Sequence, residues 1–146
     1  MLTRTAEHAL RAMLFLAQQP VGAVVPAKRI AEATGAPGNY LAKTLQALAS
    51  AGLVRGARGR EGGYALAVPA GSVTVGQVLA AFDVVAVTER CLLGDRPCTA
   101  DRPCTAHVRW QSARWAALQA MRSVRIQDLL AGLSRPEPAQ AVAARS

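Results

Sequence analysis

Aromatic side chains are scarce in this chain. They make up 4% of its 146 residues, although hydrophobic residues as a whole make up 51%. Much of the hydrophobic content is alanine, so we expect a core of closely packed helices rather than one built around large rings. The chain also lacks a run of about eighteen apolar residues, which argues against a membrane-spanning helix. Glu7 and Arg11 interrupt the first apolar stretch, which does not fit a signal peptide. We therefore expect a cytoplasmic protein without a membrane partner.

Negatively charged residues are also few. Nine Asp and Glu residues stand against seventeen Lys and Arg, which gives a formal net charge of +8. Over residues 1–68, eight basic residues face only Glu7, Glu32 and Glu61. A balance of this kind favours a polyanionic partner, nucleic acid before a membrane surface. No nucleophile–base pair, phosphate-binding loop or acid dyad occurs, so the sequence indicates neither an enzyme nor a small-molecule substrate.

Apolar residues recur at helical spacing in several segments. The expected helices cover residues 4–18, 27–34, 39–50, 75–81, 105–122 and 124–132. Thr3 and Ser123 are placed to cap the first and last of them, and Gly35 and Gly52 to end the second and third. The face of the first helix that we expect to be buried consists of Ala6, Ala9, Leu10, Met13 and Ala17.

Two of these helices, 27–34 and 39–50, are joined by the short turn GAPG, which is the helix-turn-helix pattern. Leu41, Leu45 and Leu48 form the apolar stripe of the second helix. Two β-type segments follow, 53–55 and 64–68, and they flank the basic, glycine-rich stretch GARGREGG. This arrangement predicts a hairpin wing. The expected fold class is mainly α with a small β-wing.

The expected organisation has four parts. They are a winged helix-turn-helix domain (1–82), a cysteine-containing loop (83–104), a long helical region (105–133) and a disordered tail (134–146).

In a helix-turn-helix, the start of the second helix enters the major groove of DNA. That position is occupied here by Asn39, Tyr40 and Lys43, and an Asn can pair with adenine while a Lys can reach guanine acceptors or phosphate. For Tyr40, packing against the turn is an equal alternative. We expect Arg58 and Arg60 of the wing to reach a narrow minor groove, where the negative potential is strongest. The residues that we expect to contact the DNA backbone are Lys28, Thr44 and Arg55.

Cysteine is rare and confined to one stretch, CLLGDRPCTADRPCTAH. It contains Cys91, Cys98 and Cys104, with His107 just behind. Several thiols this close together indicate a metal, an iron–sulfur cluster or a redox switch. A set of three Cys and one His also suits structural zinc, although no C-x-x-C pair occurs. Thiols near Arg96 and Arg102 could alternatively oxidise directly. The hexapeptide DRPCTA occurs twice, and a tandem duplication can copy a cysteine without any function.

Several of these motifs together resemble one family, the winged-helix regulators that include IscR, NsrR and RirA. The match is carried by LTRTAEHALRAMLFLA, by IAEATGAPGNYLAKTLQALASAGLV, by the wing RGREGGYALA and by three cysteines before a long helix. The resemblance implies a homodimeric transcription factor, in most cases a repressor, that binds a palindromic operator in double-stranded DNA. It also implies that the long helix pairs with that of a second subunit, with Trp115, Leu118 and Met121 in the interface.

The same resemblance implies an iron–sulfur cluster held by Cys91, Cys98 and Cys104, with [2Fe–2S] favoured over [4Fe–4S]. The fourth ligand is His107 in one branch of the family. In another it is an acidic residue of the partner subunit, at the position of Glu7 here. Replacing a thiolate by His or carboxylate alters the reduction potential of a cluster, so the family's regulators respond to redox state, nitric oxide or iron–sulfur supply. A cluster-free thiol switch and a structural zinc site stay open as alternatives, as does an electron carrier.

Overall fold

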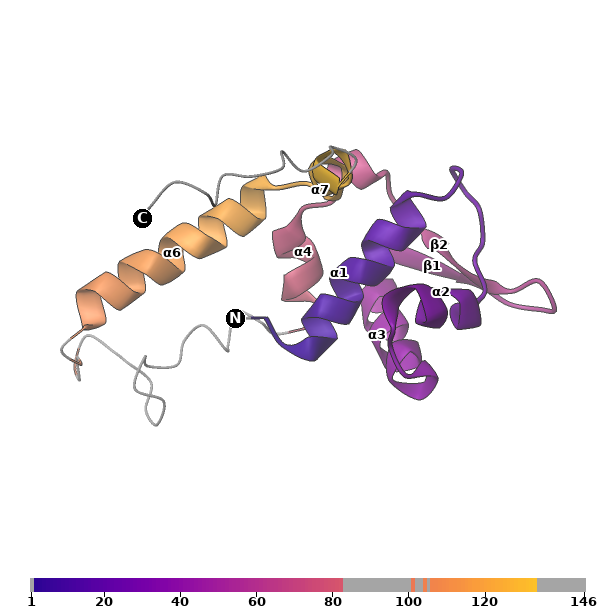
Figure 1. Cartoon of the computed structure of the whole chain (residues 1–146), viewed down its shortest axis with the longest axis horizontal. Helices are drawn as coiled ribbons and strands as arrows, with labels where there is room; N and C mark the ends of the chain where they lie inside the picture. Colours follow the sequence, from indigo (N-terminus) through magenta and orange to yellow (C-terminus); the bar gives the residue numbers. More distant parts are fainter. Residues whose placement is uncertain (1, 83–100, 102–103, 105, 134–146) are drawn as a thin grey trace, which may run out of the picture.

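The computed structural model describes residues 2–82, 101, 104 and 106–133 of the chain (Figure 1). The helices are α1 (Arg4–Ala17), α2 (Ala27–Thr34), α3 (Gly38–Ser50), the short 3-10 helix η1 (Ala70–Ser72), α4 (Val75–Ala80), α6 (His107–Ser123) and α7 (Ile126–Leu133). Two strands, β1 (Val54–Ala57) and β2 (Gly63–Leu66), form an antiparallel hairpin. Among the described residues, no helix combines the length and apolarity needed to cross a bilayer. The expected fold class, mainly helical with a small β-wing, is confirmed.

Helix α1 lies at the centre of the winged-helix half, where α2, α3, α4 and α7 pack against it (Figure 1). Thr3 caps it as predicted, because its Oγ1 accepts a hydrogen bond from the backbone N–H of Ala6 at 3.2 Å. The fully buried face differs from the predicted one. Leu10 and Ala17 are only partly buried, whereas the helix buries Ala6, Ala9, Ala12, Met13 and Leu16. Alanines at this face allow several helices to approach α1 closely.

The helix-turn-helix of α2 and α3 follows the sequence pattern closely. Helix α2 has the predicted bounds, and Gly35 ends it in the left-handed conformation at φ 67°. Helix α3 begins one residue earlier than predicted and buries Leu41, Leu45 and Leu48. After it, Gly52 has φ 73° and the N–H of Leu53 donates to the carbonyl of Leu48 at 3.0 Å. This is a Schellman ending, which satisfies carbonyls that the helix leaves without partners.

The hairpin pairs Val54 with Leu66 and Ala57 with Gly63 at its two ends. Its first strand begins one residue later than predicted and runs two residues further toward the tip, so the unpaired tip is shorter than the GARGREGG stretch. The chain between α1 and α2 also joins the sheet. The backbone groups of Val25 and Tyr64 exchange two hydrogen bonds of 2.9 Å. The base of the wing is thereby held to the start of α2.

Helix α6 leads away from the winged-helix half, and α7 packs back on it (Figure 1). Ser123 was expected to cap the last helix, but it is the last residue of α6, and α7 begins only at Ile126. The intervening chain is extended and pairs with the start of α4. The N–H of Val75 donates to the carbonyl of Val124, and the N–H of Ile126 to that of Val73, both at 2.9 Å. Asp128 then accepts from the N–H of Arg125 at 3.0 Å and satisfies the start of α7.

Candidate nucleic-acid interface and cysteine site

The first turn of α3 is open to solvent, as a helix that enters a DNA groove requires. Asn39 and Lys43 are exposed, and Tyr40 keeps 37% of its surface accessible. The residue before the helix is Pro37, which makes no side-chain capping bond. Backbone N–H groups at such a helix start attract anions through the helix dipole. Lys43 is therefore available for bases and phosphates, and so is the side-chain NH₂ of Asn39, whose Oδ1 accepts a hydrogen bond from the backbone N–H of Tyr40 at 2.9 Å.

Thr44 was predicted to contact the DNA backbone, but the structure places it on the opposite, buried side of α3. Only 1% of its surface is exposed, and its Oγ1 donates to the carbonyl of Tyr40 at 3.1 Å. A hydroxyl that bonds the preceding turn inside the protein cannot also reach a phosphate outside it. Thr44 therefore belongs to the core of the helix-turn-helix and not to the candidate interface.

Tyr40 contacts helix α1. Its hydroxyl shares a hydrogen bond with Oγ1 of Thr5, and its ring meets the ring of His8 edge to face, with centroids 5.9 Å apart. The packing alternative raised for Tyr40 is therefore observed, although against α1 rather than against the turn. Sequence reasoning missed Thr5 altogether, because nothing within a few residues of it indicates a contact with a side chain 35 positions away.

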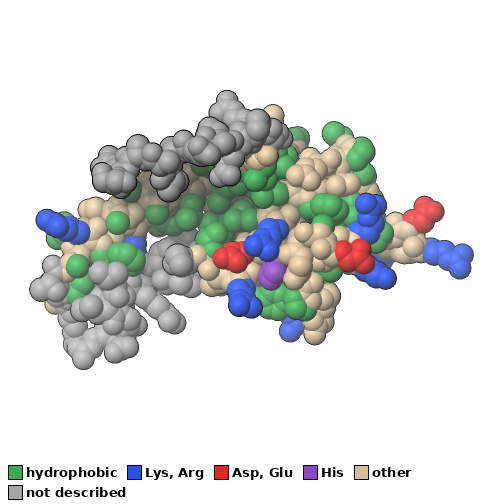
Figure 2. Space-filling model, in the orientation of Figure 1, with side chains coloured by type: hydrophobic (Ala, Val, Ile, Leu, Met, Phe, Trp, Pro, Cys, Tyr) green, Lys and Arg blue, Asp and Glu red, His purple; other side chains and the backbone are tan. Residues whose placement is uncertain are grey.

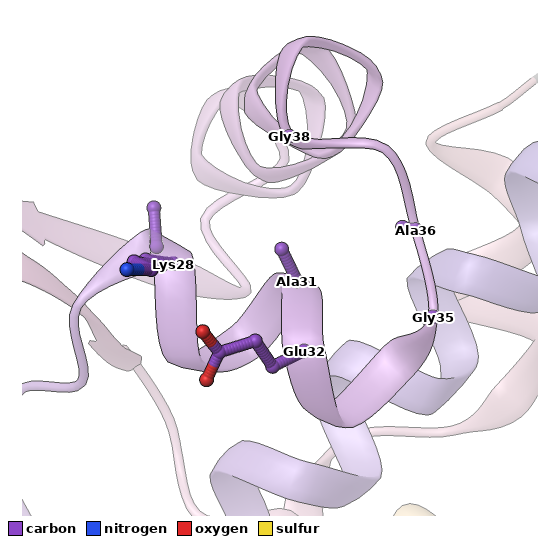
Figure 3. Close-up of a pocket in the computed structure, with 7 residues that line it drawn as sticks. Lys28, Ala31, Glu32, Gly35, Ala36 and Gly38 are labelled. Atoms are coloured by element: carbon purple, nitrogen blue, oxygen red, sulfur yellow. The ribbon is translucent and has the colours of Figure 1, made fainter.

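A shallow groove runs along the helix-turn-helix between α2 and the start of α3 (Figure 3). Lys28 lies at one end of it, Ala31 and Glu32 follow along α2, and Gly35 and Gly38 line the turn. The groove is open rather than enclosed, and it offers no buried polar group that could fix a small molecule. Lys28 is exposed, which is what a residue that positions a phosphate requires.

The wing projects beyond the rest of the molecule (Figure 1). Arg58 and Arg60 at its tip are exposed, and most Lys and Arg side chains on the face in Figure 2 lie over this half of the molecule. Gly59 sits between the two arginines at φ 105°, where a side chain would be strained. Arg55, at the base, donates to the carbonyl of Gly22 at 3.3 Å. Two cations therefore stand on a slender hairpin that could enter a minor groove.

Of the predicted cluster ligands, the structure places Cys104, His107 and Glu7. Cys91 and Cys98 lie outside the described residues. Cys104 and His107 are adjacent, because the N–H of His107 donates to the carbonyl of Cys104 at 3.0 Å in the turn that starts α6. His107 is 8% exposed, whereas Glu7 on α1 is exposed. Within the ranges that the structure covers, no three His, Cys, Asp or Glu side chains gather as a metal site would require.

Two donors that suit an iron–sulfur cluster or zinc, a thiol and an imidazole, thus lie within one turn at the beginning of a long helix. This arrangement fits part of a ligand set. A helix N-terminus also stabilises the negative charge of a thiolate-bound cluster.

Helix α6 packs little of its surface within the chain. Among its residues only His107 is buried, while Val108 keeps 75% of its surface exposed and Trp115 keeps 62%. Leu118 is half-buried beside Trp115 at a shallow hollow on the helix. Met121, predicted to share their face, packs instead against the core of the winged-helix half. It lies six positions after Trp115, which is about two-thirds of a turn round a helix of about 3.6 residues per turn.

Comparison with known proteins gives consistent matches. The sequence profile of the Rrf2 family, described as iron-dependent transcriptional regulators, matches residues 2–132. The protein Rv1287 of Mycobacterium tuberculosis, described as an HTH-type transcriptional regulator, is 37% identical over 135 residues, covering 91% of this chain and 80% of the relative. The HTH-type transcriptional regulator IscR of Citrobacter koseri is 36% identical over 110 residues, which is 75% of this chain and 67% of IscR.

Solved structures agree with the sequence matches. IscR of T. potens superposes with a TM-score of 0.70 at 26% identity, covering 96% of this chain and 93% of that one. CymR, the global cysteine regulator of B. subtilis, superposes with a TM-score of 0.75 at 22% identity, covering 90% and 97%. The second likeness is one of fold alone, so it supports the winged-helix architecture and no particular signal.

Proposed function

We propose, because this chain belongs to the Rrf2 family of iron-dependent transcriptional regulators, that it is a homodimeric repressor whose DNA affinity responds to an iron–sulfur cluster. Its relatives are transcriptional regulators, and it is one itself rather than an enzyme. The observation that carries the proposal is the exposed first turn of α3, together with a projecting wing that bears two exposed arginines. In the proposed complex, Asn39 and Lys43 read the major groove, Lys28 holds the backbone, and Arg58 and Arg60 enter the minor groove.

The dimer is supported by helix α6. A single helix of this length is marginal in water, and most helical stability in proteins comes from packing an apolar face. Here Val108 and Trp115 are exposed, and they lie seven positions apart, so they share one side of the helix. We propose that the same side of α6 from a second copy covers it. Two winged domains related by a two-fold axis would read a palindromic operator.

The substitution Arg58→Ala should lower operator affinity by at least about a hundred-fold, since a hydrogen bond to a charged group is worth about 1.5–3 kcal/mol and the proposed dimer loses two of them. It should also reduce the slope of log affinity against log salt by about two, one unit for each subunit. The measurement is a fluorescence-anisotropy titration at several salt concentrations. Its probe is a palindromic duplex selected by the wild-type protein from a random-sequence library.

Arg109→Ala provides the matched control. It removes the same charge from an exposed position near the start of α6, at the far end of the molecule from the wing (Figure 1). Its affinity and salt slope should stay close to wild type. Equal losses of operator affinity in the two variants would mean that net charge alone drives binding. If Arg58→Ala binds the operator as tightly as wild type, the wing is not part of the interface.

We propose that the cluster is held by Cys91, Cys98 and Cys104, with His107 as the fourth ligand. Support for His107 comes from its position in the same turn as Cys104 and from its burial. The alternative ligand, Glu7 of the partner subunit, is supported by its exposure and by the resemblance to the other branch of the family. When bound, the cluster would supply a redox-active, chemically labile group at the start of α6. Our proposal favours [2Fe–2S] over [4Fe–4S], because ligand sets with histidine are typical of the smaller cluster.

Anaerobically purified protein should carry iron and acid-labile sulfide and absorb in the visible range, and Cys98→Ala should lose all three. The reason is that a cluster with one thiolate fewer is held too weakly to survive purification. Thr99→Ala, the adjacent position, should keep the wild-type spectrum and iron content. Colourless wild-type protein with bound zinc would identify a structural site instead. Colourless protein without metal would leave thiols that oxidise directly.

A further inference from the structure

Few side chains support the outer side of the first turn of α3. Pro37 supplies no capping side chain and Gly38 has no side chain to pack. Asn39 is exposed, and its Oδ1 accepts a hydrogen bond from the backbone N–H of Tyr40 at 2.9 Å. The leucines that bury α3 begin at Leu41 and continue toward its C-terminal end. Leu41 anchors the inner side of the first turn in the core, so the outer side, which would meet the base edges, needs a further contact to fix its position.

Tyr40 supplies that support. Its hydroxyl is hydrogen-bonded to Oγ1 of Thr5, and its ring contacts the ring of His8 at an interplanar angle of 76°. Edge-to-face pairs of this kind contribute beyond the area that they bury. Thr5 and His8 lie three positions apart on α1, so they share one side of that helix. Two separate contacts on one rigid helix define both the position and the direction of the tyrosine side chain.

His8 is held mainly by this packing. Its Nδ1 is buried and has no hydrogen-bond partner among the described residues. A polar atom in that situation normally costs stability, so a hydrogen bond of Nδ1 does not account for the position of the ring. The ring of His8 meets the ring of Tyr40 edge to face.

We propose that Tyr40 is a positioning residue for DNA recognition, which acts by fixing the first turn of α3 against Thr5 and His8 of α1. In this role its hydroxyl does not touch the operator, and Asn39 and Lys43 read the groove from the place that Tyr40 defines. The inference rests on the proposed DNA interface of α3. We therefore expect loss of the Tyr40 hydroxyl to lower DNA affinity only in protein that still has the Thr5 hydroxyl.

A double-mutant cycle tests the proposal. Tyr40→Phe and Thr5→Val should each lower affinity for the selected operator duplex by about five-fold, the equivalent of one ordinary hydrogen bond. The double variant should be no weaker than either single one, because both changes remove the same contact. Affinity for a scrambled duplex of equal length should stay unchanged, since loose phosphate contacts do not require an aligned helix.

Three further variants separate positioning from general stability. Ser72→Ala removes a hydroxyl that donates to the carbonyl of Pro69 at 2.7 Å and contacts neither Tyr40 nor Thr5, so it should leave operator affinity unchanged. His8→Phe keeps an aromatic ring for Tyr40 and should retain most of the affinity, whereas His8→Ala should weaken it. Thermal unfolding of each variant shows how much of any loss comes from folding.

The outcomes distinguish this inference from the proposed function. If wild-type protein selects no duplex, the DNA-binding mode itself fails. If it binds and the two single effects multiply to about 25-fold in the double variant, Tyr40 and Thr5 act independently, and the tyrosine hydroxyl contacts DNA directly. Single variants that bind like wild type would also overturn the positioning role.

Discussion

Replacing Gly63 with alanine should destabilise the winged-helix domain by about 3 kcal/mol, near the upper end of what forced overpacking costs. The reason is the close approach of β2 to the chain before α2. A Cβ on Gly63 would overlap the carbonyl oxygen of Val25 and would lie 2.5 Å from its carbonyl carbon and 2.8 Å from the nitrogen of Pro26. These are backbone atoms, so they cannot rotate away as a flexible side chain could. Urea unfolding followed by circular dichroism gives the change.

Gly56→Ala is the control for this prediction. Gly56 lies in β1 of the same hairpin, opposite Tyr64, and a Cβ there would meet the nearest atom of that ring at an ordinary 3.7 Å. Its effect should stay within about 1 kcal/mol. The urea concentrations at the two unfolding midpoints should therefore differ clearly. The slope of the free energy of unfolding against urea concentration should be alike in the two variants. Coincident midpoints would mean that the wing is not held against Val25 as described.

Trp115→Glu should convert the proposed dimer into a monomer. Truncating a central aromatic anchor costs about 2 kcal/mol or more, and a two-fold interface loses two of them, so the dissociation constant should rise on the order of a thousand-fold. The introduced carboxylates would also repel each other or be desolvated. Analytical ultracentrifugation at several protein concentrations measures the shift. Operator binding should weaken in parallel, because a palindrome is read by two joined domains.

Ala117→Glu introduces the same charge two positions along α6, on the opposite side of the helix, where Ala117 is exposed. This variant should remain dimeric at the wild-type concentration. A dimer that survives Trp115→Glu would place the contact between subunits elsewhere. Dissociation of both variants alike would show that α6 is sensitive to charge in general and would not identify a face.

Some residues of the candidate site could be proposed from the sequence, and others could not. Asn39, Lys43, Arg58 and Arg60 could be proposed from the sequence because the proposal depends on local pattern: the start of a second helix and a glycine-rich basic hairpin. The cysteine stretch was equally visible, although its first two members lie outside the described residues. Thr44 was misjudged because helical position alone does not tell which polar side chain turns inward to bond its own backbone.

Local chemistry by itself determined the helix-turn-helix, the bounds of α2, the capping by Thr3 and the stops at Gly35 and Gly52, because each depends on residues within about one turn of the chain. Tertiary structure alone decided three further points. Tyr40 of α3 contacts Thr5 of α1, and Met121 packs against the core of the winged helix. The missing side chain of Gly63 allows the backbone of Val25 to approach β2. Each of these joins segments far apart in sequence. Such contacts depend on how whole helices pack, and no spacing within a single segment records them.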